Sequence, residues 1–410
     1  MCIFDGKYND MHHLKPVLPS FFLFLLFLGC ERPLTDTKAV AVIVEQMIDS
    51  LRERHAPDRR VAVFDVDLVH KEGKFVITGE TDQPAALQSL KKDLAQKDID
   101  VRDSVVLLPH PSLGDSLQAV VTISVANLRS APKHSAELAT QATLGTPVKV
   151  LKKEGSWYYI QTPDGYLAWV DNGGISVMDP ERFAVWQANE KVIYTQTYGH
   201  AYFFEDDQEP VSDLVAGAVL EVVKYGAQHY IVAFPDGRNA FVRQSEAMMY
   251  QDWLNDLDPK AENLVATSKQ LMGIPYLWGG TSTKGADCSG FTKTVYFLNG
   301  IVLPRDASQQ VHAGQPIDSV GDFSHLEAGD LLFFGRRATD TTRQKVVHVG
   351  MWIGNNEFIH ASDRVRISSM DENSPLYDAY NKGRYLRTQR MLHQKDQLLM
   401  ELAQTPLFKD

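Results

Sequence analysis

Cysteine is scarce in this chain, which has three in 410 residues: Cys2, Cys30 and Cys288. Two of them lie near the N-terminus, and only Cys288 stands within the body of the sequence. A disulfide framework is therefore excluded, and Cys288 is expected to be an unpaired thiol. A lone cysteine is more often a small buried apolar residue than a nucleophile, so its surroundings must decide between the two.

Basic residues are also in deficit, because 41 lysines and arginines face 52 aspartates and glutamates for a net charge of −11. An acidic chain without a basic run is not expected to bind nucleic acid. It is also not expected to adsorb to anionic surfaces by charge alone. Hydrophobic residues make up 44% of the chain, which is ordinary for globular proteins, and the length predicts two to four domains.

Long apolar runs are missing as well, and the run at residues 21–28 is too short to span a membrane. Lys7 and Lys15 precede this run, and Gly29 follows it. A short apolar run with basic residues before it and a small residue at its end is typical of an export signal. The signal is predicted over residues 1–29.

Cys30 follows this segment directly and resembles a bacterial lipoprotein processing site, in which the cysteine carries the lipid. Phe27 departs from that pattern, where an aliphatic residue is usual. The alternative is an ordinary signal peptide that is cleaved nearby. The prediction is an exported lipoprotein of the cell envelope, attached to a membrane through Cys30 and facing the periplasm.

Residues 30–115 predict a small α/β unit. Apolar residues recur at helical spacing over residues 38–54, and strand and helix patterns alternate over residues 64–108. The unit faintly resembles the bacterial BON domain, in pattern only. Nothing else in the sequence indicates its role.

The middle of the chain contains an internal repeat, because Pro163–Gly165 recurs as Pro235–Gly237, 72 residues later. Each copy consists of short β-type runs broken by turn residues, which is typical of a small barrel. The first copy, at residues 117–178, resembles the bacterial SH3-like domain, and residues 190–246 are predicted to be a degenerate second copy. Such barrels usually bind or position cell-wall peptides, and the alternative is that they are spacers.

The residues around Cys288 suit a thiolate. Glycines and small polar residues lead up to it, and Phe291, Val295 and Leu298 follow at helical spacing. Cys288 is therefore predicted in the first turn of a helix, with Asp287 as the N-cap. Unpaired backbone N–H groups and the helix dipole favour an anion there, so the pKa of the thiol is expected to fall.

Two histidines further along supply a candidate base. His348 lies in a buried strand pattern, Gly354–Asn356 is a turn signal, and His360 lies in the returning strand. A hairpin around this turn places the histidines nearly opposite each other on one face. His348 is the predicted base for the Cys288 thiol, and His360 is predicted to orient it. The alternatives are two structural histidines or a zinc site, although the chain lacks a CxxC or HxxxH clamp.

Six short motifs follow one another between residues 257 and 395: Pro275–Gly280, Gly285–Phe291, Leu303–Ala307, Ala328–Phe334, His348–Gly350 and Phe358–Ala361. Together they resemble the NlpC family of cell-wall cysteine peptidases, in which a helix with the cysteine packs on an antiparallel sheet with the histidines. The resemblance implies a multidomain α+β protein. Its papain-like catalytic domain follows two small SH3-like β-barrels and a small N-terminal α/β unit.

The resemblance also implies the roles of single residues. The nucleophile, the base and the third polar residue are Cys288, His348 and His360. Tyr276 is placed beside the thiol, at the oxyanion site. No metal or other cofactor is implied. Trp278 and Phe291 are expected to be core aromatics.

Two SH3-like domains before a peptidase are similar to one subgroup of this family, the γ-D-glutamyl-L-diamino acid endopeptidases of the dipeptidyl-peptidase VI type. Members cut muropeptides that have a free N-terminal L-Ala, and release L-Ala-γ-D-Glu during cell-wall turnover or recycling. In that subgroup the first barrel closes the groove, and acidic and aromatic groups hold the substrate ammonium. The expected substrate-binding residues are Asp287, which leads, and Tyr276, Ser289, Glu137 and Tyr166.

Two other functions stay open. One is a lipid-anchored wall-binding protein with an inactive peptidase domain, against which the intact set of Cys288, His348 and His360 counts. The other is an amidase or transacylase on the same fold. The chain is expected to act as a monomer on stem peptides, and the sequence does not determine whether Lys or diaminopimelate follows the D-Glu.

Overall fold

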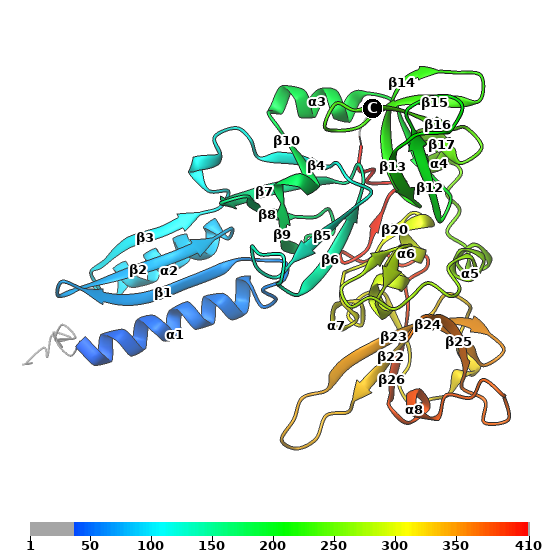
Figure 1. Ribbon diagram of the computed structural model, residues 1–410. Coiled ribbons are helices and arrows are strands. Elements are labelled where there is room, and N and C mark those ends of the chain that lie inside the picture. Colours follow the sequence, from blue (N-terminus) through cyan, green and yellow to red (C-terminus); the bar gives the residue numbers. More distant parts are fainter. Residues whose placement is uncertain (1–36, 409–410) are drawn as a thin grey trace, which may run out of the picture.

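The computed structural model describes residues 37–408 and shows four modules along the chain (Figure 1). The N-terminal unit forms an arm at one side, and two SH3-like β domains connect it to the C-terminal domain. The predicted export signal at residues 1–29 and the predicted lipid site at Cys30 lie outside the described residues. Over residues 37–408, no helix has both the length and the apolar character that crossing a membrane requires.

The N-terminal unit is a three-stranded sheet with two helices. Its elements are α1 (Thr37–His55), β1 (Phe64–Lys71), β2 (Lys74–Thr81), α2 (Pro84–Gln96) and β3 (Val101–Leu107). β1 and β2 pair antiparallel, and β3 lies parallel to β2 because α2 provides the crossover. The helices bury apolar stripes against the sheet, with Val44 and Leu90 fully buried. The predicted α/β pattern is confirmed.

Two seven-stranded antiparallel sheets form the middle of the chain. The first contains β4 (Gln118–Val121), β5 (Val125–Arg129), β6 (Leu138–Thr143), β7 (Pro147–Glu154), β8 (Trp157–Gln161), β9 (Leu167–Asp171) and β10 (Ile175–Met178). The second contains β11 (Lys191–Tyr194), β12 (Tyr198–Tyr202), β13 (Pro210–Val215), β14 (Val219–Tyr225), β15 (His229–Ala233), β16 (Asn239–Arg243) and β17 (Ala247–Met249). Helix α3 (Pro180–Ala188) joins them.

The strand orders confirm the repeat. The first sheet reads β10-β4-β7-β8-β9-β5-β6, and the second, taken from the matching edge, reads β17-β11-β14-β15-β16-β12-β13. Each strand of the second sheet therefore occupies the place of its counterpart in the first. The last five strands of the second sheet begin 72 residues after their counterparts, which is the offset of the repeat, and the first two begin 73 residues after theirs. The second copy thus diverged in sequence while its topology was retained.

The C-terminal domain packs short helices on one antiparallel sheet. Its helices are α4 (Tyr250–Asn255), α5 (Ala261–Gln270), α6 (Cys288–Leu298), α7 (Ala307–Gln310) and α8 (Ala379–Gly383). Its sheet has the order β21 (Gln315–Asp318), β26 (Tyr385–Arg390), β22 (Leu331–Arg336), β23 (Lys345–Gly354), β24 (Glu357–Ala361) and β25 (Val365–Ser369). Phe291 and Val295 of α6 join Val349 and Ile359 of the sheet in one core. This packing holds the first residue of α6 against the sheet and confirms the predicted α+β fold.

Two short strand pairs complete the connections. β18 (Thr281–Ser282) and β19 (Gly285–Ala286) form a small hairpin directly before α6. Near the end of the chain, β27 (Met400–Glu401) pairs with β20 (Ile301–Val302). Leu402 and Phe408 are buried in the same apolar cluster as Trp186. The C-terminal segment therefore ties the C-terminal domain to the helix between the two SH3-like domains.

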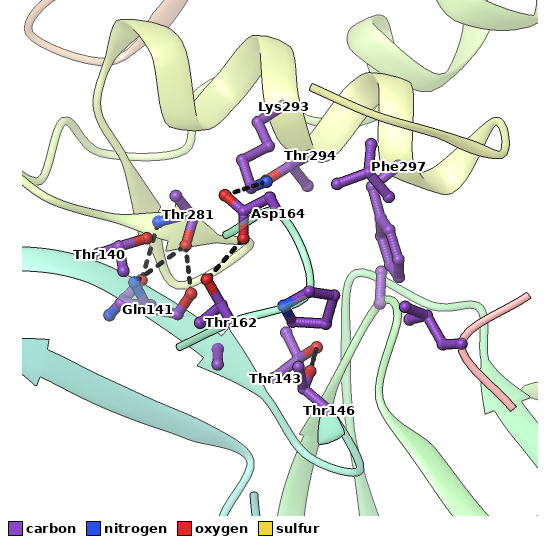
Figure 2. A pocket seen from close by; sticks show the side chains of 15 residues that line it. Thr140, Gln141, Thr143, Thr146, Thr162, Asp164, Thr281, Lys293, Thr294 and Phe297 are labelled. Carbon is purple, nitrogen blue, oxygen red and sulfur yellow. Dashed lines mark hydrogen bonds and ion pairs between the residues drawn. The ribbon is translucent and has the colours of Figure 1, made fainter. Parts of the chain in front are cut away.

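The first SH3-like domain is joined to α6 by a buried ion pair (Figure 2). Asp164, in the turn Pro163–Gly165, lies 2.9 Å from Lys293 Nζ, and its other oxygen accepts from Thr162 Oγ1 at 2.6 Å. Their side chains are only 10% and 15% exposed. Because an unpaired buried charge is costly, this pair fixes the position of the domain relative to α6.

Candidate active site

Cys288 is the first residue of α6, and Asp287 is the N-cap of that helix, as predicted. Asp287 Oδ1 accepts the Gly290 N–H at 2.7 Å. The loop before the helix passes so close that a Cβ on Gly290 would lie 1.9 Å from the Gly280 carbonyl oxygen, so only glycine fits there. Cys288 lines a cavity and is 7% exposed.

Burial raises the pKa of the Cys288 thiol to about 12, and the negative charge of Asp287 acts in the same direction. The backbone N–H of Val349, the charge of Arg305 and the N–H of Ser289 oppose this rise without cancelling it. The predicted fall of the thiol pKa is therefore wrong, because loss of water outweighs the helix terminus. The thiol is protonated at neutral pH and needs a base for its proton.

The two predicted histidines meet in the sheet, where His348 Nε2 and His360 Nδ1 lie 2.7 Å apart. The strand register sets His360 opposite Gly350, because a bulge between Trp352 and Gly354 shifts the pairing. A Cβ on Gly350 would lie 3.2 Å from the His360 Cβ. The histidines thus share one face, as predicted, but they are diagonal neighbours rather than opposite residues.

The hydrogen bonds allow two arrangements of protons in this pair, and one of them leaves a nitrogen of His348 unprotonated. His360 Nε2 lies 3.1 Å from Ser368 Oγ. If His360 donates to Ser368, its Nδ1 accepts from His348 Nε2–H, which leaves His348 Nδ1 free to accept a proton. Val349, one residue along, packs in the same core as Cys288, and its backbone N–H lowers the pKa of the thiol. The unprotonated nitrogen therefore belongs to a residue whose neighbour lies beside Cys288.

Both histidines are neutral at physiological pH. Burial lowers the pKa of His348 well below its usual value, and the nearby His360 lowers it further. Burial also lowers the pKa of His360 to about 4. A neutral His348 can accept the thiol proton, and His360 and Ser368 orient it without carrying a charge.

Tyr276 lies close to the thiol, as expected. Burial raises its pKa to about 12, and the charges of Cys288 and Asp287 add to this effect. The hydroxyl therefore stays protonated and is available as a hydrogen-bond donor. Its action at an oxyanion site stays a prediction.

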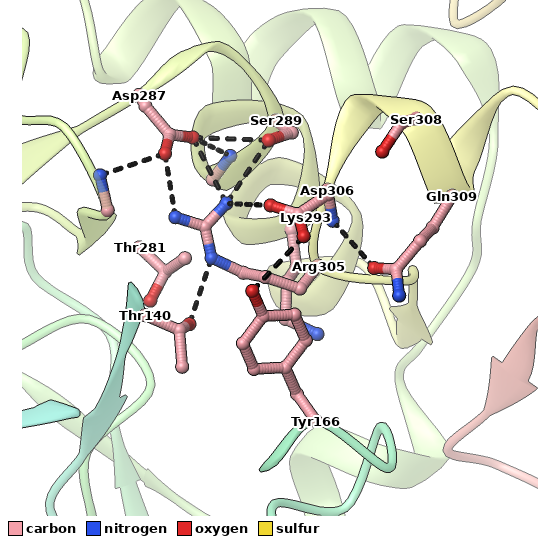
Figure 3. Close-up of polar contacts among 12 residues, drawn as sticks. Thr140, Tyr166, Thr281, Asp287, Ser289, Lys293, Arg305, Asp306, Ser308 and Gln309 are labelled. Carbon is pink, nitrogen blue, oxygen red and sulfur yellow. Dashed lines mark hydrogen bonds and ion pairs between the residues drawn. The ribbon is translucent and has the colours of Figure 1, made fainter. Parts of the chain in front are cut away.

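Asp287 has different partners from those predicted (Figure 3). Arg305, which is 1% exposed, binds both of its oxygens, with Nη2–Oδ2 at 2.7 Å and Nη1–Oδ1 at 3.1 Å. Gly279 N–H donates to Oδ2 at 3.0 Å, in addition to the N-cap bond and a 3.2 Å bond from Ser289 Oγ. These five donors use the capacity of the carboxylate. The charge of Asp287 is thus paired with Arg305, and its contact with a substrate ammonium stays a prediction.

Ser289 belongs to the same buried network, since its hydroxyl accepts from Arg305 Nη1 at 3.1 Å. Arg305 Nε donates to Thr140 Oγ1 of the first SH3-like domain at 2.9 Å. The guanidinium therefore connects the start of α6 to that domain. Neither Arg305 nor this contact was predicted, because the sequence separation between the partners is large and only the fold brings them together.

A cavity of about 510 Å³ opens above the sulfur, and the N-terminal unit, the first SH3-like domain and the C-terminal domain all contribute to its walls. The predicted residues Tyr276, Asp287, Cys288, Ser289, Glu137 and Tyr166 all line it. Trp278 also lines it and is 62% exposed, so its expected place in the core is wrong. Its indole N–H donates to Glu137 Oε1 at 2.7 Å, which orients that carboxylate.

Asp306 also lines this cavity. It was not predicted from the sequence as a site residue, although it belongs to the motif Leu303–Ala307. Tyr166 donates its hydroxyl proton to Asp306 Oδ2 at 3.1 Å (Figure 3). Arg60 Nη1 reaches the same oxygen at 2.7 Å. Asp306 is 27% exposed and lines the cavity, so it offers a carboxylate that a ligand can reach.

Metal ligands do not gather in the part of the chain that the structure describes. Over residues 37–408, no group of three or more histidines, cysteines, aspartates and glutamates is arranged to hold a metal ion. His348 and His360 use two of their ring nitrogens on each other.

Two family models match the chain. One is described as the NlpC/P60 family and matches residues 273–384, and one is described as the bacterial SH3 domain and matches residues 124–176. The first covers Cys288, His348 and His360. The second lies within the first SH3-like domain.

Named relatives match over a longer stretch. A γ-D-glutamyl-L-lysine dipeptidyl-peptidase of Bacillus cereus is 32% identical over 250 residues, which is 59% of this chain and 72% of that protein. A dipeptidyl-peptidase 6 of Lysinibacillus sphaericus is 28% identical over 286 residues, or 64% of this chain and 94% of that protein.

A solved structure agrees with these matches. The crystal structure of an NlpC/P60 family protein from Bacillus cereus covers 67% of this chain and 99% of its own, at 28% identity and a TM-score of 0.57. About a third of this chain therefore has no counterpart in that structure. The resemblance inferred from the motifs is confirmed: the chain belongs to the NlpC/P60 family and is a cysteine peptidase.

Proposed function

We propose that this peptidase hydrolyses the bond between γ-D-Glu and the diamino acid of peptidoglycan stem peptides, acting on muropeptides with a free N-terminal L-Ala. The observation that carries the proposal is the carboxylate of Asp306, which lines the same cavity as Cys288 and is held by Tyr166 of the first SH3-like domain. The name of the Bacillus cereus relative, a γ-D-glutamyl-L-lysine dipeptidyl-peptidase, supports the bond. The name of the Lysinibacillus sphaericus relative, dipeptidyl-peptidase 6, supports the release of a dipeptide.

The proposed reaction begins at the sulfur. Cys288 Sγ attacks the side-chain carbonyl carbon of D-Glu, while the thiol proton moves to His348 Nδ1. The C–N bond then breaks, and the amine of the diamino acid leaves with that proton. A water molecule next gives a proton to His348 and attacks the thioester, which releases the γ-carboxylate and restores the thiol. Tyr276 donates a hydrogen bond to the oxyanion in both steps.

The free amine of L-Ala is proposed to lie against Asp306 and Glu137. Asp306 already binds Arg60, and Glu137 accepts from Trp278. Two carboxylates in one cavity still favour an ammonium group over the neutral amide that acylation leaves. Asp287, in contrast, acts as the N-cap and as the partner of Arg305. It thereby positions Cys288 and the floor of the cavity rather than the amine.

The cellular setting follows from the sequence and is proposed with the activity. A lipid on Cys30 attaches the monomeric enzyme to a membrane of the cell envelope, facing the periplasm. A requirement for a free L-Ala amine makes intact cell wall a poor substrate. The enzyme then trims peptides that other hydrolases have released, during turnover or recycling.

The test is a rate comparison on two peptides of identical sequence, L-Ala-γ-D-Glu-diaminopimelate and its N-acetylated form. The expected result is release of L-Ala-γ-D-Glu from the first and about 100-fold lower kcat/KM on the second, as for the loss of hydrogen bonds to charged groups. Comparable rates on both peptides would reject the ammonium site. A peptide with Lys in the third position identifies the preferred diamino acid.

The other two functions are outcomes of the same test. A protein that binds these peptides without cleaving them is an inactive wall-binding lipoprotein. Acyl transfer to an added amine in preference to water indicates a transacylase. The His348–His360 pair lies next to Val349, which packs in the same core as Cys288. This placement favours hydrolysis over binding alone, because binding does not need a proton acceptor beside a thiol.

A further inference from the structure

The N-terminal unit reaches the catalytic cavity through the loop between α1 and β1. The carbonyl oxygen of Arg60 in this loop accepts from Leu167 N–H of the first SH3-like domain at 2.7 Å. The carbonyl of Val61 accepts from Gln161 Nε2 at 3.4 Å. These bonds hold the loop backbone on the SH3-like domain and direct the Arg60 side chain toward the C-terminal domain.

The Arg60 guanidinium is held on two sides. Asp58 binds it in a fork, with Nε–Oδ1 at 2.8 Å and Nη2–Oδ2 at 2.7 Å. Nη1 donates to Asp306 Oδ2 at 2.7 Å and to Ser308 Oγ at 3.0 Å. Asp58 also accepts from Gln309 Nε2 at 2.7 Å. A planar guanidinium with these four bonds has little freedom to turn, so its position is fixed by two modules at once.

Arg60 stands between two cavities. The cavity of about 510 Å³ that contains Cys288 is lined by Arg60 and Ser308. A neighbouring cavity of about 790 Å³ is lined by the same two residues and by Pro57, Arg59 and His312, but not by Cys288. The contact between Arg60 and Ser308 therefore belongs to the wall that separates the neighbouring cavity from the thiol.

We propose that Arg60, which the N-terminal unit supplies, is a specificity-determining residue of the peptidase. Its guanidinium forms the wall of the cavity beyond the amino end of the substrate. This inference rests on the proposed function, because it takes the amine of L-Ala to lie at Asp306. It also gives the N-terminal unit a role in the reaction. The family models that match this chain begin at residue 124, after that unit.

The chemistry of the wall explains how it discriminates. A peptide that continues beyond L-Ala has to enter the neighbouring cavity, and it can do so only by displacing the guanidinium. Displacement leaves Asp58 and Asp306 without their shared partner, at a cost that a longer substrate must overcome. A peptide that ends at L-Ala fits without this displacement, and it contacts Asp306 on the side that Arg60 leaves free.

The experiment compares the wild-type chain with Arg60→Ala, Arg60→Lys and the matched control Arg59→Ala. Arg59 is the adjacent arginine, its side chain is 82% exposed, and it lines only the neighbouring cavity. The first measurement is kcat/KM on the free and N-acetylated peptides. Arg60→Ala is expected to reduce the ratio of the two at least tenfold, mainly because the acetylated peptide is cleaved faster. Arg60→Lys keeps the charge without the fork and should give an intermediate ratio, and Arg59→Ala should keep the wild-type ratio.

The second measurement needs no substrate. Cys288 is alkylated with iodoacetamide and with an iodoacetamide that carries a long uncharged tail, and modification is followed on the peptide that contains Cys288. The tailed reagent should react much more slowly with the wild type, and Arg60→Ala should reduce this difference at least fivefold. If the wild type cleaves neither peptide, the proposed function fails and this measurement alone decides on the wall.

The outcomes separate the two proposals. An unchanged peptide ratio in an enzyme that is active, or an unchanged difference between the alkylating reagents, overturns the role of Arg60. An equal change in Arg59→Ala also overturns it, because the effect then belongs to the loop and not to the guanidinium. If Arg60→Ala fails to fold, as judged by thermal unfolding, Arg60→Lys carries both comparisons.

Discussion

The two SH3-like domains have the same strand order, but they meet the peptidase domain in different ways. Ser130, Glu137 and Tyr166 of the first domain line the cavity above Cys288. Among the described residues, none of the second domain lines that cavity. The second domain instead contacts the hairpin before α6, where Thr283 bonds to the Thr197 carbonyl. A duplicated module thus kept its fold and acquired two uses.

Equivalent turns show how this difference arises. Asp164 and Asp236 occupy the same place in the two copies of Pro-Asp-Gly. Asp164 is buried against Lys293 of α6, whereas Asp236 pairs at 2.8 Å with Arg238 two residues along the chain, on the surface. The turn determines where each carboxylate lies on its own domain, and the neighbouring domain determines what that carboxylate does.

The largest expected effect is the loss of the thiol. Cys288→Ala should reduce kcat by about 10⁴-fold or more, because the acyl intermediate forms on the Cys288 sulfur. Alkylation of the wild type should have the same result, and a chelator should have none. Unfolding by denaturant is measured as the control, since a variant that is inactive through misfolding says nothing about the nucleophile. Residual activity near the wild-type level would contradict the assignment.

The histidines come next. His348→Ala should lower kcat by about 10²–10⁴-fold, the usual range for loss of a general base. His360→Ala should cost clearly less, because His360 acts through His348. Steady-state rates on the free-amine peptide separate the two. Similar losses in both variants would indicate that the pair is structural.

The matched turns allow a direct test of the comparison. Asp164→Ala should destabilise the protein by about 3–5 kcal/mol, because it leaves Lys293 buried without its partner. Asp236→Ala should cost under about 1 kcal/mol, as for an exposed pair. Equilibrium unfolding in urea gives both values. The double change Asp164→Ala with Lys293→Met should recover much of the loss, and failure to recover would mean that the turn itself is at fault.

A smaller effect is expected on substrate binding. Tyr166→Phe removes the hydrogen bond to Asp306 and should raise KM by about 10–100-fold with little change in kcat, since hydrogen bonds to charged groups contribute about 1.5–3 kcal/mol. Arg238 is the equivalent residue of the second domain, and Arg238→Ala should leave KM unchanged. A KM effect from Arg238→Ala would show that both domains, and not the first alone, serve the cavity.

The smallest effect is expected for pH near neutrality. Because burial lowers the pKa of His348, the base stays unprotonated, and the rate should change less than about twofold between pH 8 and 6.5. At lower pH the rate should fall as the histidine pair gains protons. A rate that falls already between pH 8 and 7 would contradict this prediction.

The ion pair of Asp164 responds to pH separately from the histidines. Lys293 holds the pKa of Asp164 below its usual range in spite of burial, so the stabilisation from that pair is lost only at still lower pH.

Several features of the site were accessible to sequence reasoning because they depend on local pattern. The N-cap at Asp287 and the helix after it follow from residues within one or two turns. The hairpin of His348 and His360 follows from a turn signal between two apolar runs, although its bulge moved the register by one diagonal step. Trp278 was misjudged because hydrophobicity alone does not tell a core aromatic from one that lines an open cavity.

The sequence by itself determined the modules, the duplicated SH3-like domain, the helix with Cys288 and the two histidines, because each depends on the spacing of residues that are close in the chain. Only the tertiary structure decided the charges in the cavity. It buried the thiol and raised its pKa, paired Asp287 with Arg305, and brought Tyr166 and Arg60 to Asp306. Burial and ion pairing depend on which surfaces come together, and these partners come from three separate modules.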